Sequence, residues 1–515
     1  MKVAIATFML GLILTGCQSM KEKQVPLTES VSTLYEPSLK PFYHGVASGD
    51  PLADRVILWT RVTPEFQVSK IQVTWEVASD KNFTSVYKSD TLSTSPARDY
   101  TVKVDVDGLQ PGQKYYYRFK ALNATSPVGQ TKTTPVTGLD SLKLGIVSCS
   151  NWEWGYFHAY DKLADRTDVD AVIHLGDYIY EYGQGRYGDT TIRKNLPAGE
   201  IVSLEDYRVR HSLYRLDKGL RRMNQQHPLI AIWDDHEVAN NVYTTGAQNH
   251  QPDLEGDFAK RKASAIQAYY EWLPIRESDK HYRSFSYGSL ADLIMLDERL
   301  EGRTKPAESM DDPLFQSEEQ TMLGSEQVAW FENGLKNSKA VWKIIGNQVI
   351  FSEVELSPVY PKMPRNLDSW DGYPKEKERL VNFIRQEKIK DLIFVTGDTH
   401  ASWAIEAATD VVKTYNSRTS AGAFAIELGT TSVSSANDNE YHSTDTVEMM
   451  ERALQKVNPH IRYVNARDHG YLLLTLYPTR AKSEWYYMET LRQPETREYL
   501  GKRVEIKQGS VRLSE

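Results

Sequence analysis

The chain has 515 residues, of which 40% are hydrophobic and 25% are charged, and its formal net charge is -8. This is ordinary globular composition, and the length suits two or three domains better than one small core. The negative charge and the absence of a long basic run exclude the electrostatic footprint that binds nucleic-acid backbones.

The N-terminus has the features of an export signal. An apolar run at 3–14 follows a basic residue and is too short to span a bilayer, but it has the length of a signal-peptide core. The run ends in LTGC (14–17), which resembles the lipobox of bacterial lipoproteins. We therefore predict a lipoprotein signal peptide at 1–16, lipid attached to Cys17 and a lipidated tether at 17–39. The alternative is an apolar N-terminus that stays uncleaved.

Residues 40–138 are predicted to form an all-β sandwich. Its apolar and polar residues alternate with a period of two, and a Pro-Gly turn feeds an aromatic strand, as at the corner of a fibronectin type III or immunoglobulin-like domain. The predicted strands are 56–62, 71–77, 100–106 and 114–122. Linker composition in Thr131–Ser141 places the domain boundary near 138–142. No cluster of catalytic side chains occurs here, so we interpret the domain as a spacer or lid.

Residues 142–515 alternate short apolar runs with helical patterns, which predicts a layered α/β domain. The clearest predicted helices are Tyr156–Leu163, Phe258–Trp272, Gly324–Asn337 and Lys375–Gln386. Three irregular stretches are longer than structural connections usually are, which makes them candidate substrate loops. These stretches are 183–203, 300–320 and 430–445.

The apolar runs of this domain end repeatedly in an acid, a histidine, a cysteine or an amide. In open α/β sheets the carboxyl ends of the strands form the crevice in which ligands bind. Donors brought to one such edge would build a multi-metal site. The runs lead to Cys149, Asp177, Asp234-Asp235-His236, Asp297, Asn347 and Asp398-Thr399-His400.

Sulfur, oxygen and nitrogen donors recur at three of these ends. Cys149 as thiolate, Asp177 and Tyr180 as oxygen donors, and His400 as imidazole would suit a transition metal, with zinc still possible. Asp177 could bridge two cations. As alternatives, Gly-Asp after a strand is common turn chemistry and a lone cysteine is often a small buried hydrophobe.

The segment WDDHEVANN (233–241) is rich in carboxylates and amides. Such oxygens suit hard cations such as calcium or magnesium, although Asp235 could instead cap a helix. His236 is expected as a phosphate contact or leaving-group acid. Residues two apart on an extended chain point to the same side, so Asp398 and His400 could address neighbouring metals. Asn347 is an amide-ligand candidate or a turn residue.

Asp297 and Arg299, two residues apart in LDERL, are interpreted as forming a structural ion pair or as contacting the metal ligands from behind. The chemistry that the whole set predicts is phosphate-ester hydrolysis. Two cations polarise a phosphoryl oxygen and lower the pKa of an attacking water from about 16 to roughly 7. The chain has no G-x-S-x-G elbow and no P-loop, which disfavours a serine nucleophile.

The motifs SCSN, HLGDYIYEYG, WDDHEVANN, RKASAIQAYYEWLP, TGDTHAS and NPHIRYVN occur in this order. Together with the opening FYHGVASGDPLADRVILWTR, they resemble the PhoD family of alkaline phosphatases and phosphodiesterases, within the wider metallophosphatase group. The resemblance covers about 40–510. It implies an immunoglobulin-like N-terminal domain followed by a four-layer αββα metallophosphatase domain.

The resemblance also implies one ferric ion and two calcium ions. The iron would be held by Cys149, Asp177, Tyr180 and His400. The calcium ligands would be Asp177, Asp234, Asn241 and Asp398, with Asp235 and Asn347 as further candidates. His236 would sit against the phosphate, and with Asp235 it is our catalytic candidate.

We therefore expect a secreted, lipid-anchored alkaline phosphatase that acts on small phosphate esters or lipids outside the cytoplasm, in the periplasm, at the outer membrane or at the cell surface. We expect a monomer. The alternatives are a phospholipase D-like phosphodiesterase and a non-catalytic surface-binding lipoprotein. Many family members carry a twin-arginine signal, whereas only Lys2 precedes the apolar run here. Metal loading is therefore expected after export.

Overall fold

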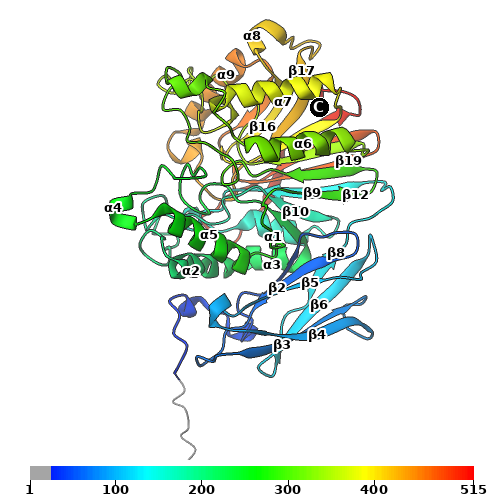
Figure 1. Cartoon of the computed structure of the whole chain (residues 1–515), viewed down its shortest axis with the longest axis vertical. Coiled ribbons are helices and arrows are strands. Elements are labelled where there is room, and N and C mark those ends of the chain that lie inside the picture. The colour runs from blue at the N-terminus through cyan, green and yellow to red at the C-terminus, as the bar shows by residue number, and fades with distance from the viewer. Residues whose placement is uncertain (1–24) are drawn as a thin grey trace, which may run out of the picture.

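The computed structural model describes residues 25–515, so the predictions of a signal peptide and of a lipid on Cys17 lie outside the described residues. Within the described range no helix is both long enough and apolar enough to cross a membrane. The layers are stacked along the long axis of the molecule, with the N-terminal β-domain at one end and α6 and α7 near the other (Figure 1).

Two large sheets form the centre of the molecule. The ten-stranded sheet has the order β22-β21-β20-β19-β9-β10-β11-β1-β2-β5, and the seven-stranded sheet has the order β12-β13-β14-β15-β17-β16-β18. The first contains β22 (Leu513–Ser514), β21 (Glu498–Lys507), β20 (Arg480–Met488), β19 (Gly470–Tyr477), β9 (Leu142–Val147), β10 (Ala171–His174), β11 (Pro228–Ala231), β1 (Val46–Gly49), β2 (Val56–Arg61) and β5 (Thr101–Val106). The second contains β12 (Arg283–Tyr287), β13 (Ala291–Met295), β14 (Trp342–Asn347), β15 (Leu392–Thr396), β17 (Ala423–Gly429), β16 (Ser402–Ala408) and β18 (Ile461–Asn465).

The strands at the centre are buried on both faces. In β10, Ile173 packs between the two sheets, whereas Val172 packs on the outer side against helices. A strand covered on both faces reads as a continuous apolar run, which is the pattern of this part of the sequence. The helices over this outer face are α1 (His158–Asp165), α2 (Leu204–Arg215), α3 (Lys218–Gln226) and α5 (Phe258–Trp272).

The seven-stranded sheet is covered by α6 (Gly324–Asn337) and α7 (Pro374–Gln386), whose apolar faces pack on β14 and β15. This completes a four-layer αββα arrangement, as expected. The remaining helices are α4 (Pro252–Glu255), α8 (Val411–Thr414) and α9 (Thr444–Val457). Local signals set the helix ends: the Asp257 side chain caps α5 by accepting from the Ala259 backbone N–H, and Pro374 starts α7.

The N-terminal sandwich is present, but one of its sheets continues into the catalytic sheet. A separate sheet of β3 (Ile71–Ala78), β4 (Val86–Thr94), β6 (Lys114–Ala121), β7 (Ala124–Thr125) and β8 (Gly129–Lys132) packs on β1, β2 and β5 across an apolar core. β1 pairs in parallel with β11, the strand that leads to Asp234. Backbone hydrogen bonds therefore join the N-terminal region to the catalytic sheet.

Candidate metal centre

The predicted donors meet where the strands of both sheets end. β9, β10 and β11 are parallel neighbours in one sheet and lead to Cys149, Asp177 and Asp234. In the facing sheet, β15 leads to Asp398 and His400. The two sheets therefore deliver side chains to one buried region from opposite sides.

Five predicted ligand residues share an uncommon backbone conformation. Their φ angles are positive: 60° at Cys149, 56° at Asp177, 52° at Asn241, 61° at Asp398 and 58° at His400. Non-glycine residues rarely adopt this left-handed region, and such residues cluster at functional sites.

One donor group combines sulfur, carboxylate and imidazole. The ligand atoms of Cys149, Asp177 and His400 all lie within 4.8 Å of one another. Tyr180 joins them, because its hydroxyl donates to Asp177 Oδ2 at 2.8 Å and lies 3.2 Å from His400 Nε2. Burial and the neighbouring Asp177 carboxylate raise the pKa of the Cys149 thiol well above its ordinary value. A thiolate here would need a cation beside it.

His400 is oriented for ligation through Nε2. Its Nδ1 lies 2.7 Å from the Ala436 carbonyl oxygen, to which an Nδ1–H donates, and the Tyr187 hydroxyl is 3.4 Å from the same nitrogen. Burial lowers the pKa of His400 to about 4, so the ring is neutral. By holding the proton on Nδ1, the Ala436 carbonyl leaves Nε2 free to bind a metal.

The second donor group consists of carboxylates. Oxygens of Asp234, Asp235 and Asp398 lie within 4.8 Å of one another. Burial raises the pKa of Asp234 to about 8 and that of Asp398 to about 7. Asp234 Oδ2 is buried and has no hydrogen-bond partner. An orphaned carboxylate oxygen in an all-oxygen group fits a hard cation such as calcium.

Arg299 contributes positive charge to this second group. Its buried guanidinium pairs with Asp234, lies 3.3 Å from Asp398 and is held by Asp368 at 2.6 Å. Of the two expected roles, the ion pair between Asp297 and Arg299 is not formed by their side chains: Asp297 Oδ1 accepts from the Arg299 backbone N–H at 2.9 Å, and Oδ2 faces His281 Nδ1 at 3.5 Å. The other expected role, a contact behind the donor residues, is the one that Arg299 has.

His236 lies next to the bridging position. Ligand atoms of Asp177, Asp235 and His236 form a third group within 4.8 Å, so Asp177 belongs to two groups. His236 Nδ1 lies 2.7 Å from Glu181 Oε2, and its ring packs on Tyr180 with centroids 4.2 Å apart. Burial alone would lower the pKa of His236. The carboxylates of Asp235, Glu181 and Asp177 outweigh burial and raise that pKa well above its ordinary value.

Glu237 ties two of the strand ends together and was not singled out from the sequence. Its carboxylate accepts backbone N–H bonds from Asp177 at 3.0 Å, Tyr178 at 2.6 Å and Asp234 at 2.8 Å. Its position in the WDDHE run was the one available signal. Gly176 lets the chain before Asp177 lie close to Asp234. Its φ is +104°, and a Cβ there would lie 2.3 Å from the Asp234 backbone nitrogen.

Two predicted amide ligands differ in placement. The backbone N–H of Asn241 donates to Asp235 Oδ2 at 2.6 Å, which puts this residue beside the carboxylate group. The amide of Asn347 is engaged elsewhere: Oδ1 accepts from Trp370 Nε1 at 3.1 Å and Nδ2 donates to the Val349 carbonyl oxygen. In the structure the Asn347 amide therefore bonds within the protein, and its ligand role stays a prediction.

Known proteins resemble this chain along most of its length. Residues 144–485 match the PhoD-like phosphatase family, and residues 29–135 match the N-terminal domain of PhoD-like phosphatases. Alkaline phosphatase D of Bacillus subtilis (strain 168) is 36% identical, with 94% of this chain and 83% of the relative covered. A solved structure described as the structure of PhoD is 35% identical, with a TM-score of 0.82 over 93% of this chain and 92% of the other.

Proposed function

The chain belongs to the PhoD-like phosphatase family and is a phosphoric ester hydrolase, and we propose that it is an exported alkaline phosphatase that hydrolyses phosphomonoesters and phosphodiesters. The single observation that carries this proposal is the chain of buried donor groups at the strand ends: Asp177 belongs to the group of Cys149 and His400 and to that of His236, and Asp235 links the latter to Asp234 and Asp398. Cations held by these neighbouring groups would lie close enough to act on one phosphoryl group.

We assign a ferric ion to the first group and calcium to the second. Thiolate, phenolate and neutral imidazole suit a transition metal, whereas carboxylate and amide oxygens suit calcium. The iron would be held by Cys149, Asp177, Tyr180 and His400, and the calcium ions by Asp177, Asp234, Asp235, Asn241 and Asp398. When bound, such ions polarise the phosphoryl group and lower the pKa of the attacking water.

His236 handles a proton in this proposal. Its Nδ1 is fixed by Glu181, and Glu181 is itself held by the Asn240 backbone N–H and the Asn249 amide, both at 2.8 Å. The opposite nitrogen, Nε2, is then free to contact a phosphoryl oxygen or to protonate the leaving alkoxide. Arg299 holds Asp234 and Asp398 in place on the other side of the site.

The activity is tested by steady-state hydrolysis of a phosphomonoester and of a phosphodiester by the metal-loaded protein. We expect both to be cleaved with an alkaline optimum, and Asp177→Asn to abolish both. If wild-type protein loaded with iron and calcium cleaves neither ester, the proposal is wrong. A diester preference well above the monoester rate would favour the phosphodiesterase alternative.

Membrane attachment is proposed from the sequence. LTGC (14–17) would place a lipid on Cys17, and Gln18, which is not the aspartate that commonly retains lipoproteins in inner membranes, favours an outer membrane. We expect Cys17→Ala to move the protein from the membrane fraction to the aqueous fraction. Mass spectrometry of the mature N-terminus would contradict the proposal if Cys17 carried no lipid. Light scattering of the mature protein tests the proposed monomer.

A further inference from the structure

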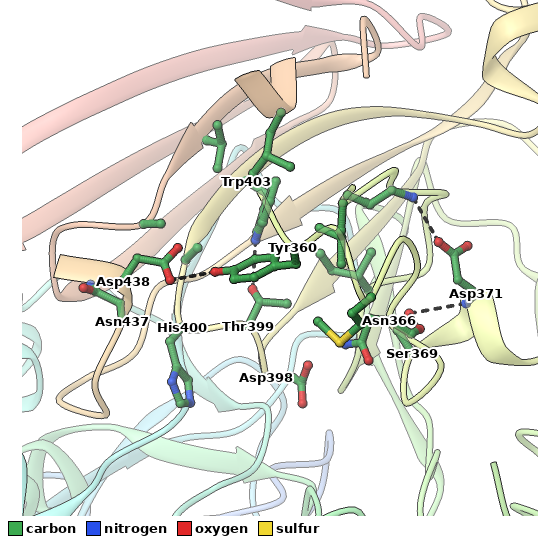
Figure 2. Close-up of a pocket in the computed structure, with 18 of the residues that line it drawn as sticks. Tyr360, Asn366, Ser369, Asp371, Asp398, Thr399, His400, Trp403, Asn437 and Asp438 are labelled. Atoms are coloured by element: carbon green, nitrogen blue, oxygen red, sulfur yellow. Dashed lines mark hydrogen bonds between the residues drawn. The ribbon is translucent and has the colours of Figure 1, made fainter. Parts of the chain in front are cut away.

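A cavity of about 370 Å³ opens directly beside the metal centre. Asp398 and His400 lie along one side of it, with Thr399 between them, and Trp403 and Tyr360 stand next to them (Figure 2). The cavity therefore shares its wall with both donor groups, because Asp398 belongs to the carboxylate group and His400 to the thiolate group. A phosphoryl group held at the metals would point one ester substituent into this space.

Half of the residues that line the cavity are apolar. Most of these apolar residues belong to a hydrophobic cluster formed with α9, β16 and β18. Members of this cluster that line the cavity are Ile350, Val354, Leu356, Ala401, Trp403, Leu454, Val464 and Ala466. Trp403 is fixed in place, since its Nε1 donates to Thr399 Oγ1 at 2.8 Å. Met363 also lines the cavity and is 45% exposed, so it marks the mouth.

The acidic side chains of the lining are already engaged by other protein groups. Asp371 accepts from Lys377 at 2.7 Å, and Asp438 accepts from the Tyr360 hydroxyl at 2.7 Å. No lysine or arginine is among the described residues that line the cavity. A second phosphate or a carboxylate on the substrate would therefore find no positive partner in the cavity. It would instead meet apolar side chains and the carboxylates of the lining.

We propose that this cavity binds the alcohol part of the substrate and that the enzyme prefers phosphate esters of uncharged, apolar alkyl or aryl alcohols. The inference rests on the proposed function, because it places the phosphoryl group at the metal centre. Burial of the substrate's apolar surface in a preformed pocket favours apolar alcohols over charged ones. Trp403 and Tyr360 offer ring faces for an aryl group.

The test compares kcat/KM for ethyl, butyl and hexyl phosphate with the metal-loaded protein. Each added methylene is expected to raise kcat/KM about twofold to threefold, so that hexyl phosphate exceeds ethyl phosphate by about thirtyfold. Met363→Glu places a carboxylate at the mouth, and Leu356→Trp fills part of the cavity. Both variants are expected to lower the hexyl-to-ethyl ratio by about tenfold.

Met449→Glu is the matched control, because Met449 is 58% exposed on α9 and does not line the cavity. It is expected to keep the wild-type ratio. A flat chain-length series, or an equal loss of the ratio in Met449→Glu, would overturn the inference.

A binding measurement separates this inference from the proposed function. Hexylphosphonate and ethylphosphonate carry a C–P bond that hydrolysis does not cleave, and calorimetry gives their dissociation constants without turnover. Tighter binding of hexylphosphonate than of ethylphosphonate, lost in Met363→Glu, supports the cavity assignment even if no ester is hydrolysed. The absence of hydrolysis would contradict the proposed function alone. Equal binding of the two phosphonates overturns the cavity assignment.

Discussion

The candidate metal centre has two halves that differ in chemistry although the same two sheets build both. The thiolate half combines Cys149, Tyr180 and His400, whereas the carboxylate half combines Asp234, Asp235 and Asp398. Asp177 touches the first half directly and reaches the second through Asp235. The thiolate half has a neutral imidazole and no cationic side chain in its donor group, while the carboxylate half carries the Arg299 guanidinium.

This difference teaches how one strand-end architecture can select two kinds of cation. In the proposed assignment, softer donors on one side would take a transition metal and hard oxygens on the other would take calcium, with Asp177 and Asp235 linking the two halves. Substitutions can therefore be aimed at one half, at the other or at the bridge between them.

The largest effect is expected from Asp177→Asn, which removes the bridge. An amide cannot supply two anionic oxygens, so both halves should lose affinity and activity should fall by about a thousandfold or more. Metal analysis beside the activity assay checks this. Asp170→Asn, a change in a carboxylate that pairs with Lys132 away from the centre, is the control. Retention of full metal content in Asp177→Asn would contradict the bridging role.

Cys149→Ser should damage one half only. We expect loss of visible absorption from thiolate-bound iron and a fall in activity of about a hundredfold, with calcium content preserved. Absorption spectra and elemental analysis of the variant report the two halves separately. An equally coloured and active variant would remove Cys149 from the ligand set.

Asp398→Asn should produce the mirror result. It should lower calcium affinity and activity by about one to two orders of magnitude while the colour persists. Treatment with EGTA should reproduce the loss in the wild-type protein, and added calcium should reverse it. If magnesium or zinc restores the activity equally well, the calcium assignment fails.

Glu181→Gln tests the residue behind His236 and should leave both metals bound. Without the carboxylate, His236 should lose its proton at lower pH, so the alkaline limb of the kcat profile should shift to lower pH and kcat should fall about tenfold. Glu181→Asp should recover part of the profile. A uniform loss of activity with an unmoved pH profile would mean that Glu181 is only structural.

The smallest effect concerns stability and pH in the metal-free protein. Burial raises the pKa of Asp234 to about 8 and that of Asp398 to about 7. Between the ordinary carboxyl range and these values the folded chain binds more protons than the unfolded chain, so the free energy of unfolding falls as pH rises through this window. Bound metal should cancel that loss. Thermal unfolding of chelated and loaded protein should therefore diverge by several degrees as pH rises from 5 to about 8. A constant difference would contradict the assignment of these carboxylates as ligands.

The sequence predicted the parts of this arrangement that local patterns encode. The bounds of α5 and α6 agree with the predicted helices, because each has a clear apolar period and a defined end. The strand ends at Cys149, Asp177 and Asp398 were visible for the same reason. Side-chain directions were not visible: Asn347 turns to Trp370, and Arg299 turns to Asp234 instead of its neighbour Asp297.

Long-range pairing was also beyond the sequence patterns. The parallel contact of β1 with β11 joins residues that lie far apart in the chain, and nothing in either strand marks the other as its partner. Glu237 escaped notice because its three acceptor contacts are to backbone N–H groups, which leave no signature in residue type.

The central claim is that the site holds a transition metal in its thiolate half and calcium in its carboxylate half. Its most direct test is elemental analysis of the mature protein, purified without chelators, together with its visible spectrum. We expect about one iron and about two calcium ions per chain with a visible absorption band. Zinc or manganese in place of iron, without colour, would contradict the assignment of iron to the thiolate half. No stoichiometric metal after reconstitution would contradict the metal centre itself.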